Sequence, residues 1–139
     1  MVQLIVGEKG KGKTKQLLEK VNTDVQNILG SIVYLDKSAK HMYELNNKVR
    51  LIDVSQYNIE NNSEFIGFVS GILSQDHDLQ QMYFDNFLDI AKENCAQMEA
   101  TVAKLEKMSV AFNVDFILSV SANKDDLPRN LKEKVIIAL

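Results

Sequence analysis

The chain has 139 residues, the size of one domain, with hydrophobic and charged fractions of 45% and 25% that are typical of globular proteins. Its formal net charge of −3 argues against a nucleic-acid backbone as the main partner. No apolar run reaches the ~20 residues of a membrane-spanning helix, no signal peptide is recognisable, and Cys95 is the single cysteine. We therefore expect one cytoplasmic domain, residues 1–139, without a membrane partner.

Strands and helices are predicted to alternate in the first half of the chain. Residues 2–6 form a short apolar run that is typical of a buried strand, and residues 13–21 have apolar side chains at helical spacing. β-branched and aromatic residues predict a second strand over Ser31–Asp36. Residues 49–54 are compatible with an extra strand at an edge of the sheet.

The second half of the chain continues this alternation. Asn61 is a suitable cap for a helix, and a strand with an acidic end is predicted over 79–85. Over 86–112 the apolar residues recur every three or four positions, which predicts one long helix that covers a sheet, with a coiled-coil seam as the alternative. A further strand is expected over 114–120.

The last predicted elements are a helix that begins near Pro128 and a strand over 135–139. Strands that alternate with helices indicate an α/β fold in three layers, with helices on both faces of a mainly parallel sheet. Ligands of such sheets bind beyond the carboxyl ends of the strands.

The most specific motif lies between the first strand and the first helix. It reads Gly7-Glu8-Lys9-Gly10-Lys11-Gly12-Lys13-Thr14 and matches the pattern G-x-x-x-x-G-K-[S/T] in full. Its glycines let backbone amides surround phosphate oxygens, and the helix that begins near Lys13 adds its positive dipole end. Lys13 offers a cation to the β- and γ-phosphates, and the Thr14 hydroxyl is a suitable Mg²⁺ ligand. The motif predicts a nucleotide-binding loop for ATP or GTP with Mg²⁺.

A nucleotide-hydrolysing site of this kind also needs a carboxylate that holds the magnesium ion through its water shell. Asp36, Asp53 and Asp85 are candidates, because each ends or lies within a predicted strand. We favour Asp85, because the apolar residues 82–84 before it form a strand end of the Walker B type. A cap for the following helix is the alternative role of Asp85, and Asp36 is the second candidate. Lys13 and Asp85 are thus the expected catalytic residues, and Thr14 and Asp85 the metal-binding pair.

The order of these elements resembles the RecA-like division of P-loop NTPases. The resemblance rests on the glycine loop after the first strand, on the strands that end at Asp36 and Asp85, and on the next strand with its polar end. It implies the strand order 5-1-4-3-2 and a polar sensor residue that faces the γ-phosphate. Ser119, Ser121 or Asn123 matches that sensor position.

The whole chain also resembles short single-domain ATP-binding proteins of Gram-positive bacteria, some of which are labelled twitching-motility-ATPase-like. Residues 4–14, 48–54 and 118–122 carry this resemblance. Pilus-retraction ATPases have a separate amino-terminal domain and a histidine box, which His41 and His77 do not form. We expect both histidines to be lone surface residues.

ATP hydrolysis that is slow, or that an unknown protein partner activates, is the expected activity. Asn86 follows the Walker B candidate, and its amide cannot take a proton from water as a glutamate would. The only arginines are Arg50 and Arg129, and a solvent-exposed cation is the simpler interpretation of Arg129. Glu8 and Asp115 are other carboxylates without a supporting motif.

Two alternative functions remain open at this stage. A nucleotide-dependent switch or binding module needs neither an arginine nor a catalytic glutamate. A small-molecule kinase uses the same loop but needs a lid and an arginine cluster, and the two arginines of this chain argue against it.

Overall fold

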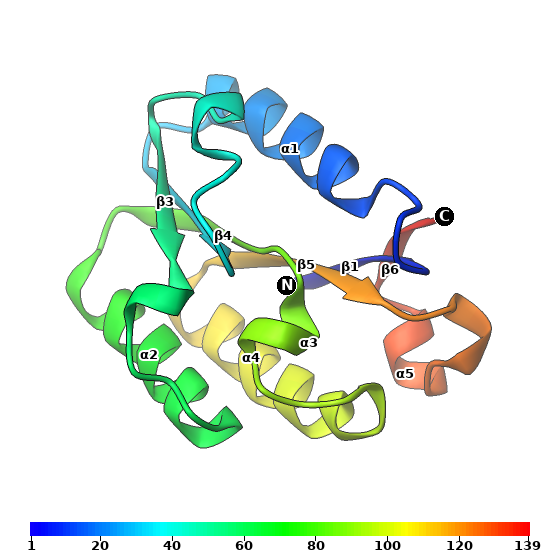
Figure 1. The fold of residues 1–139 in the computed structure, drawn as a ribbon. Helices are drawn as coiled ribbons and strands as arrows, with labels where there is room; N and C mark the ends of the chain where they lie inside the picture. The colour runs from blue at the N-terminus through cyan, green and yellow to red at the C-terminus, as the bar shows by residue number, and fades with distance from the viewer.

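Six strands form one sheet in which all neighbouring strands run parallel (Figure 1). The computed structural model describes all residues, 1–139. The strands are β1 (Val2–Gly7), β2 (Ser31–Asp36), β3 (Val49–Asp53), β4 (Leu79–Phe84), β5 (Asp115–Ser121) and β6 (Val135–Ala138). Parallel neighbours require long crossover connections, and helices supply most of them here. The fold is therefore of the α/β class.

Helices lie on both faces of the sheet, an arrangement compatible with the expected three layers. They are α1 (Lys13–Asp24), α2 (Asn62–Gln75), α3 (Phe87–Ile90), α4 (Met98–Phe112) and α5 (Arg129–Lys132). In Figure 1, α1 lies above the sheet, and the other four helices lie below it. None of these helices combines the length and the apolar character that a membrane crossing requires.

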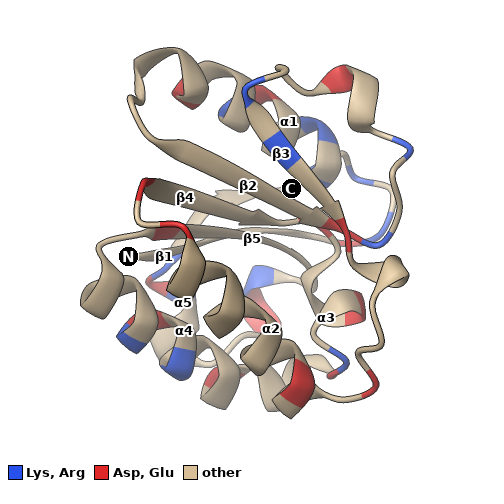
Figure 2. Cartoon of the chain, turned by 90° about the vertical axis from the view of Figure 1, so that its left-hand side faces the viewer, with Lys and Arg blue, Asp and Glu red and all other residues tan.

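Each face of the sheet has its own hydrophobic core. The core under α2 and α4 contains 25 buried residues, and the core under α1 contains nine. The neighbouring residues Leu4 and Ile5 of β1 belong to different cores, because successive side chains of a strand point to opposite faces. The strands carry few charged residues, and acidic positions gather at their tips on the right of Figure 2. A sheet buried on both faces leaves its strand ends as the place for polar chemistry.

The strand order is β3-β2-β4-β5-β1-β6, which differs from the expected 5-1-4-3-2. The expected order contains five strands, and residues 49–54 were considered only as a possible extra strand at an edge of the sheet. In the structure, β3 pairs with β2 along its whole length, from Ile32 opposite Val49 to Asp36 opposite Asp53. This sixth strand satisfies backbone groups that would otherwise be exposed at the edge of β2.

The single helix predicted over 86–112 is wrong, because the chain breaks between α3 and α4. Lys92 has a φ of 58°, outside the right-handed helical region. The side chain of Asn94 accepts a bond from the backbone of Gln97, and the Gln97 side chain accepts one from the backbone of Asn94, which makes a capping box. Apolar residues on both sides of the break are buried in the same core, so their spacing concealed it. α4 covers the sheet as expected and forms no coiled-coil seam.

The other helix signals are confirmed. The side chain of Asn61 accepts a bond from the backbone of Glu64 and caps α2. Pro128 directly precedes α5, where its fixed φ suits the start of a helix.

Candidate functional site

The loop between β1 and α1 depends on glycine at positions that have different physical demands. Gly10 and Gly12 have φ values of 84° and 95°, and a Cβ at either position would touch nothing within 4 Å. Their backbone conformation, not crowding, therefore requires glycine. At Gly7 a Cβ would lie 3.0 Å from the Cβ of Leu139, so Leu139 would have to shift by a few tenths of an ångström to admit a side chain there.

Lys13 begins α1 and is only 8% exposed. Its ammonium donates to the backbone oxygen of Glu8 at 3.1 Å, so the side chain folds back over the loop. Burial lowers the pKa of Lys13, and the negative charge of Asp85 acts in the opposite direction. No side chain caps the start of α1, so the first backbone amides of this helix have no partner within it. Gly12, Lys13 and Thr14 at this helix start line one cavity.

The structure brings Thr14 and Asp85 together, although 71 positions separate them in the sequence. The Thr14 hydroxyl donates to Oδ1 of Asp85 at 3.1 Å. Thr14 lies in the first turn of α1, and Asp85 directly follows β4. Both groups are hard oxygen ligands of the kind that Mg²⁺ prefers. The two residues predicted as a metal-binding pair are therefore direct neighbours.

Asp85 is buried and held by several further donors. Its Oδ1 also accepts bonds from the Ser119 hydroxyl at 2.9 Å and from the backbone of Asn86 at 3.0 Å. Its Oδ2 accepts a bond from the Tyr34 hydroxyl at 2.8 Å. Burial, and then the charge of Asp85, raises the pKa of Tyr34, so that phenol stays protonated as a donor. The orientation of the carboxylate is thus fixed before any ligand arrives.

The predicted sensor residues lie in different places. Ser119 is buried, and its hydroxyl donates a hydrogen bond to Asp85. Ser121 is exposed at the end of β5 and faces the space beside the loop. Asn123 donates from its side chain to Oε1 of Glu8 at 3.1 Å. Of the three, Ser121 is the residue that lines this space, and Ser119 positions Asp85.

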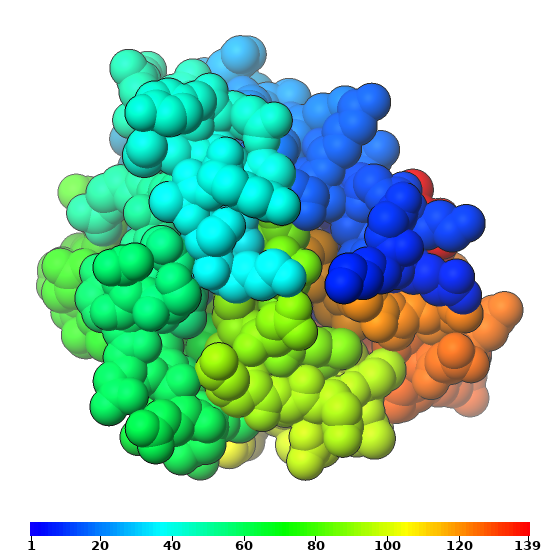
Figure 3. All heavy atoms as spheres, viewed as in Figure 1, coloured from blue at the N-terminus to red at the C-terminus, as the bar shows by residue number.

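A cavity of about 250 Å³ lies where the loop, the end of β4 and the end of β5 meet. We call it the loop cavity, and its lining consists of Lys9, Gly10, Gly12, Lys13, Thr14, Asp85, Asn86 and Ser121. None of these residues is hydrophobic. Figure 3 shows this face, with the loop in dark blue, the segment after β4 in light green and the segment after β5 in orange. The loop cavity is a small polar hollow with a buried charge of each sign.

Asp36, the second candidate carboxylate, lies beside Asp85 at the end of β2. Its Oδ1 accepts bonds from the backbone of Lys37 at 2.7 Å and from the Asn86 amide at 3.5 Å, whereas its buried Oδ2 has no partner. Burial, and then the charge of Asp85, raises the pKa of Asp36. Ligand atoms of Asp36, Asp85 and His41 lie within 4.8 Å of one another. Two carboxylates this close need a proton or a cation between them.

The other candidates lie outside the loop cavity. Asp53 accepts a bond from the backbone of Ser55 and caps a turn. Arg50 pairs with Asp76 at 3.0 Å, and Arg129 is exposed at the start of α5. Asp115 pairs with the terminal amino group at the amino end of β5. No arginine lines the loop cavity.

Tyr34 was not among the predicted site residues, and the expectation that His41 is a lone surface residue is wrong. Tyr34 lies two residues before Asp36 in β2, and residues at that spacing share a face of the sheet. From that spacing, the sequence could have predicted that Tyr34 lies near Asp36. The His41 side chain is only 21% exposed and lies against the carboxylates, whereas His77 is exposed as expected.

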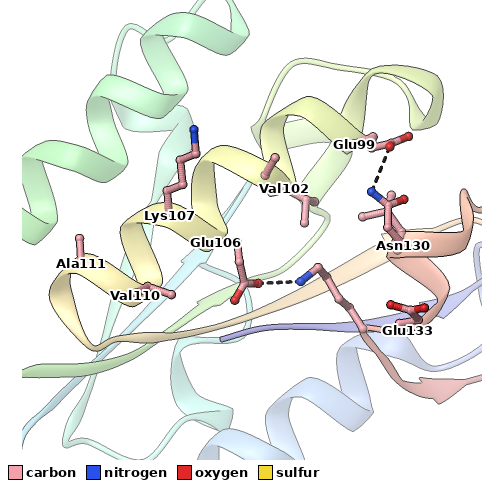
Figure 4. A pocket seen from close by; sticks show the side chains of 11 residues that line it. Glu99, Val102, Glu106, Lys107, Val110, Ala111, Asn130 and Glu133 are labelled. Atoms are coloured by element: carbon pink, nitrogen blue, oxygen red, sulfur yellow. Dashed lines mark hydrogen bonds and ion pairs between the residues drawn. The ribbon is translucent and has the colours of Figure 1, made fainter.

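A second concave surface lies on the helical side of the molecule (Figure 4). This α4 groove has a volume of about 610 Å³ and runs between α4 and residues 130–134, which comprise most of α5 and the turn before β6. Val102 and Leu131 form part of its apolar lining, and Glu106 pairs with Lys134 at 2.8 Å. It shares no lining residue with the loop cavity.

No protein-family model matches the chain, and no curated protein matches it. We therefore infer the function from the geometry of the residues themselves.

Proposed function

We propose that the protein binds ATP with Mg²⁺ at residues 7–14 and hydrolyses it slowly, or only when a partner activates it. The observation that carries the proposal is the 3.1 Å contact between the Thr14 hydroxyl and Asp85. A chance glycine-rich turn would have no reason to meet a buried carboxylate from another strand at its Lys-Thr end. The loop motif and this contact are independent observations, and both are what a magnesium–phosphate site needs.

Each residue of the loop cavity has a role in this proposal. The amides of the loop and of the first turn of α1 surround the phosphates, and the Lys13 ammonium moves from the Glu8 oxygen to the β- and γ-phosphates. Thr14 and Asp85 would hold the Mg²⁺ ion. The bound ion would neutralise phosphate charge. Ser121 lies where a sensor of the γ-phosphate would be needed.

The volume of the loop cavity supports a triphosphate as the buried part of the ligand. At about 250 Å³ it is smaller than the ~300–1,000 Å³ typical of sites that enclose a whole ligand. The base and ribose would then lie on the adjoining surface. The loop cavity therefore selects for phosphates.

Slow hydrolysis follows from what the lining lacks. No arginine faces the loop cavity, and the residue after Asp85 is an asparagine. An arginine aimed at the transferred phosphoryl group is worth ~10³–10⁵ in rate. The cations of the lining are Lys9 and Lys13, so a partner or a second subunit would have to supply the missing charge.

The strand arrangement supports a place in the RecA-like division. If β3 is set aside as an edge addition, the other five strands, numbered in chain order, lie in the sequence 5-1-4-3-2 from the β6 edge. The strand of the glycine loop and the strand of Asp85 are then separated by one strand, β5, whose end carries Ser121.

A nucleotide-dependent switch without hydrolysis is the second candidate, and the missing arginine favours it as well. The small-molecule kinase has no supporting observation, because no cluster of arginines adjoins the loop cavity.

Calorimetric titration with ATP, in Mg²⁺ and then in EDTA, tests the binding proposal. We expect one site per chain, with tighter binding in Mg²⁺; no binding at millimolar ATP would overturn the proposal.

A phosphate-release assay with saturating Mg·ATP then separates the two candidates. We expect a turnover far below the ~10 s⁻¹ median of enzymes. No release at all would favour the switch, and several turnovers per second from the isolated protein would contradict the missing-arginine argument.

A further inference from the structure

A second cluster of metal-ligand side chains lies behind the loop cavity. It consists of Asp36, His41 and Asp85, whose ligand atoms lie within 4.8 Å of one another. The cluster is assembled from the ends of two neighbouring strands, β2 and β4, and from the segment that follows β2. We propose that Asp36, His41 and Asp85 bind a divalent transition-metal ion, such as Zn²⁺, Co²⁺ or Mn²⁺, in the absence of nucleotide.

The first support is an unpaired oxygen of a buried carboxylate. Asp36 is 1% exposed, and its Oδ2 has no hydrogen-bond partner. Buried polar atoms are nearly always paired, and a buried carboxylate oxygen without a partner is costly. Asp85, also 1% exposed, brings a second negative charge to the same place. A cation between the two carboxylates would satisfy Oδ2 and remove their repulsion.

The second support is the partner of His41. Its Nδ1 pairs with the carboxylate of Glu44, three residues further on. Metal-binding histidines usually donate one ring N–H to a carboxylate, which fixes the ring and leaves the other nitrogen to bind the ion. The Glu44 contact therefore leaves Nε2 as the metal-binding nitrogen.

The donor set determines the class of metal. One imidazole nitrogen and two carboxylate oxygens suit zinc, cobalt and manganese, whereas Mg²⁺ prefers oxygen ligands alone. Ligands of one zinc ion at ~2.0–2.2 Å lie at most ~4.4 Å apart. Since the ligand atoms already lie within 4.8 Å, small rotations of the side chains would complete the site.

This ion is distinct from the magnesium of the proposed function. Oδ1 of Asp85 meets Thr14 and Ser119, whereas Oδ2 faces the side of Tyr34. The inference needs no nucleotide, so it can fail or succeed independently of ATP binding.

Cobalt titration of the nucleotide-free protein, followed by visible absorption, tests the inference. The absorption of bound Co²⁺ reports its ligands, and displacement by Zn²⁺ gives the competing affinity. We expect one Co²⁺ per chain, with at least ~100-fold weaker binding in His41→Gln and ~10-fold weaker binding in Glu44→Gln. His77→Gln, which alters the other histidine, is the matched control and should bind like the wild type.

Two further variants keep the result interpretable. Asp36→Asn should lose Co²⁺ affinity while thermal unfolding shows an intact fold, so the loss would not reflect misfolding. Thr14→Ala should keep Co²⁺ affinity. The inference is overturned if wild type binds no Co²⁺, if His41→Gln binds like wild type, or if Thr14→Ala removes the site.

Discussion

The loop cavity and the α4 groove are both hollows of the surface, but they differ in what lies beneath. The groove has more than twice the volume, about 610 Å³ against 250 Å³. Its ion pair, Glu106 with Lys134, is part-exposed, so water solvates both charges. The loop cavity instead holds Lys13 and Asp85, which are 8% and 1% exposed.

The proposed site therefore differs from the groove in its buried charge and not in a larger volume. A buried charge costs folding free energy, and proteins keep such groups mainly where a ligand or a reaction uses them. An apolar depression such as the α4 groove costs little, because exposed apolar atoms are ordinary on protein surfaces. Substitutions at the buried charges should therefore change nucleotide affinity more than substitutions in the α4 groove.

The largest effect is expected for Lys13→Ala, measured by titration with a fluorescent ATP analogue. The variant removes charge-assisted bonds to the phosphates and should weaken Mg·ATP binding by about 10- to 100-fold. Lys107→Ala, an exposed lysine of the α4 groove, is the matched control and should leave the affinity unchanged. Equal affinities in wild type and Lys13→Ala would contradict the proposed role of Lys13 in phosphate binding.

A smaller effect, roughly 10-fold, is expected for Asp85→Asn in Mg²⁺, because the variant removes a charge that acts through the ion. In EDTA its nucleotide affinity should stay close to that of the wild type. The alternative role of Asp85 as a helix cap is wrong, since Asn86 is the cap residue of α3 and no side chain caps that helix. Unchanged affinity of Asp85→Asn in Mg²⁺ would contradict the proposed role of Asp85 in holding the ion. A magnesium-dependent loss in Asp36→Asn instead would move the metal carboxylate to β2.

Asp36→Asn should stabilise the metal-free protein by about 1 kcal/mol at pH 7, because it removes a buried charge, one oxygen of which has no hydrogen-bond partner. The pKa of Asp36 is raised in the folded state, so the ionised carboxylate destabilises the fold above that pKa. Below the model-compound value of 3.8, the folded and unfolded states are both protonated and the gain should vanish. Urea unfolding in EDTA at several pH values measures this, and a gain that is constant with pH would contradict the assignment.

The smallest effect is expected in the α4 groove. Lys134→Met removes the part-exposed ion pair with Glu106 and should cost less than about 1 kcal/mol, and still less at high salt. Its ATP affinity should equal that of the wild type. A large loss of affinity would mean that the groove communicates with the loop cavity.

The sequence predicted several features that depend on neighbouring residues, but a longer pattern concealed one of them. The loop motif and the helix cap at Asn61 are local, and each could be recognised from a few adjacent side chains. The break near Lys92 was hidden, because the burial of apolar residues continued through it. The nearby Asn94 and Gln97 carried a visible capping signal that the longer apolar pattern outweighed.

The candidate site shows the same limit. Asp85 could be selected because an apolar strand precedes it, but its contact with Thr14 required the strand order. The position of His41 depends on how the segment after β2 folds back, and no periodic pattern describes such a segment. The pairing of β3 with β2 was likewise left open, since a short edge strand has little sequence signal of its own.

The rest position of Lys13 has a consequence for the entropy of binding. A free lysine side chain loses up to ~2 kcal/mol of conformational freedom when it is fixed. Here the ammonium already lies on the Glu8 oxygen, and most of the side chain is buried. Much of that freedom is therefore lost when the chain folds, and an arriving phosphate has only to replace one carbonyl oxygen as the acceptor.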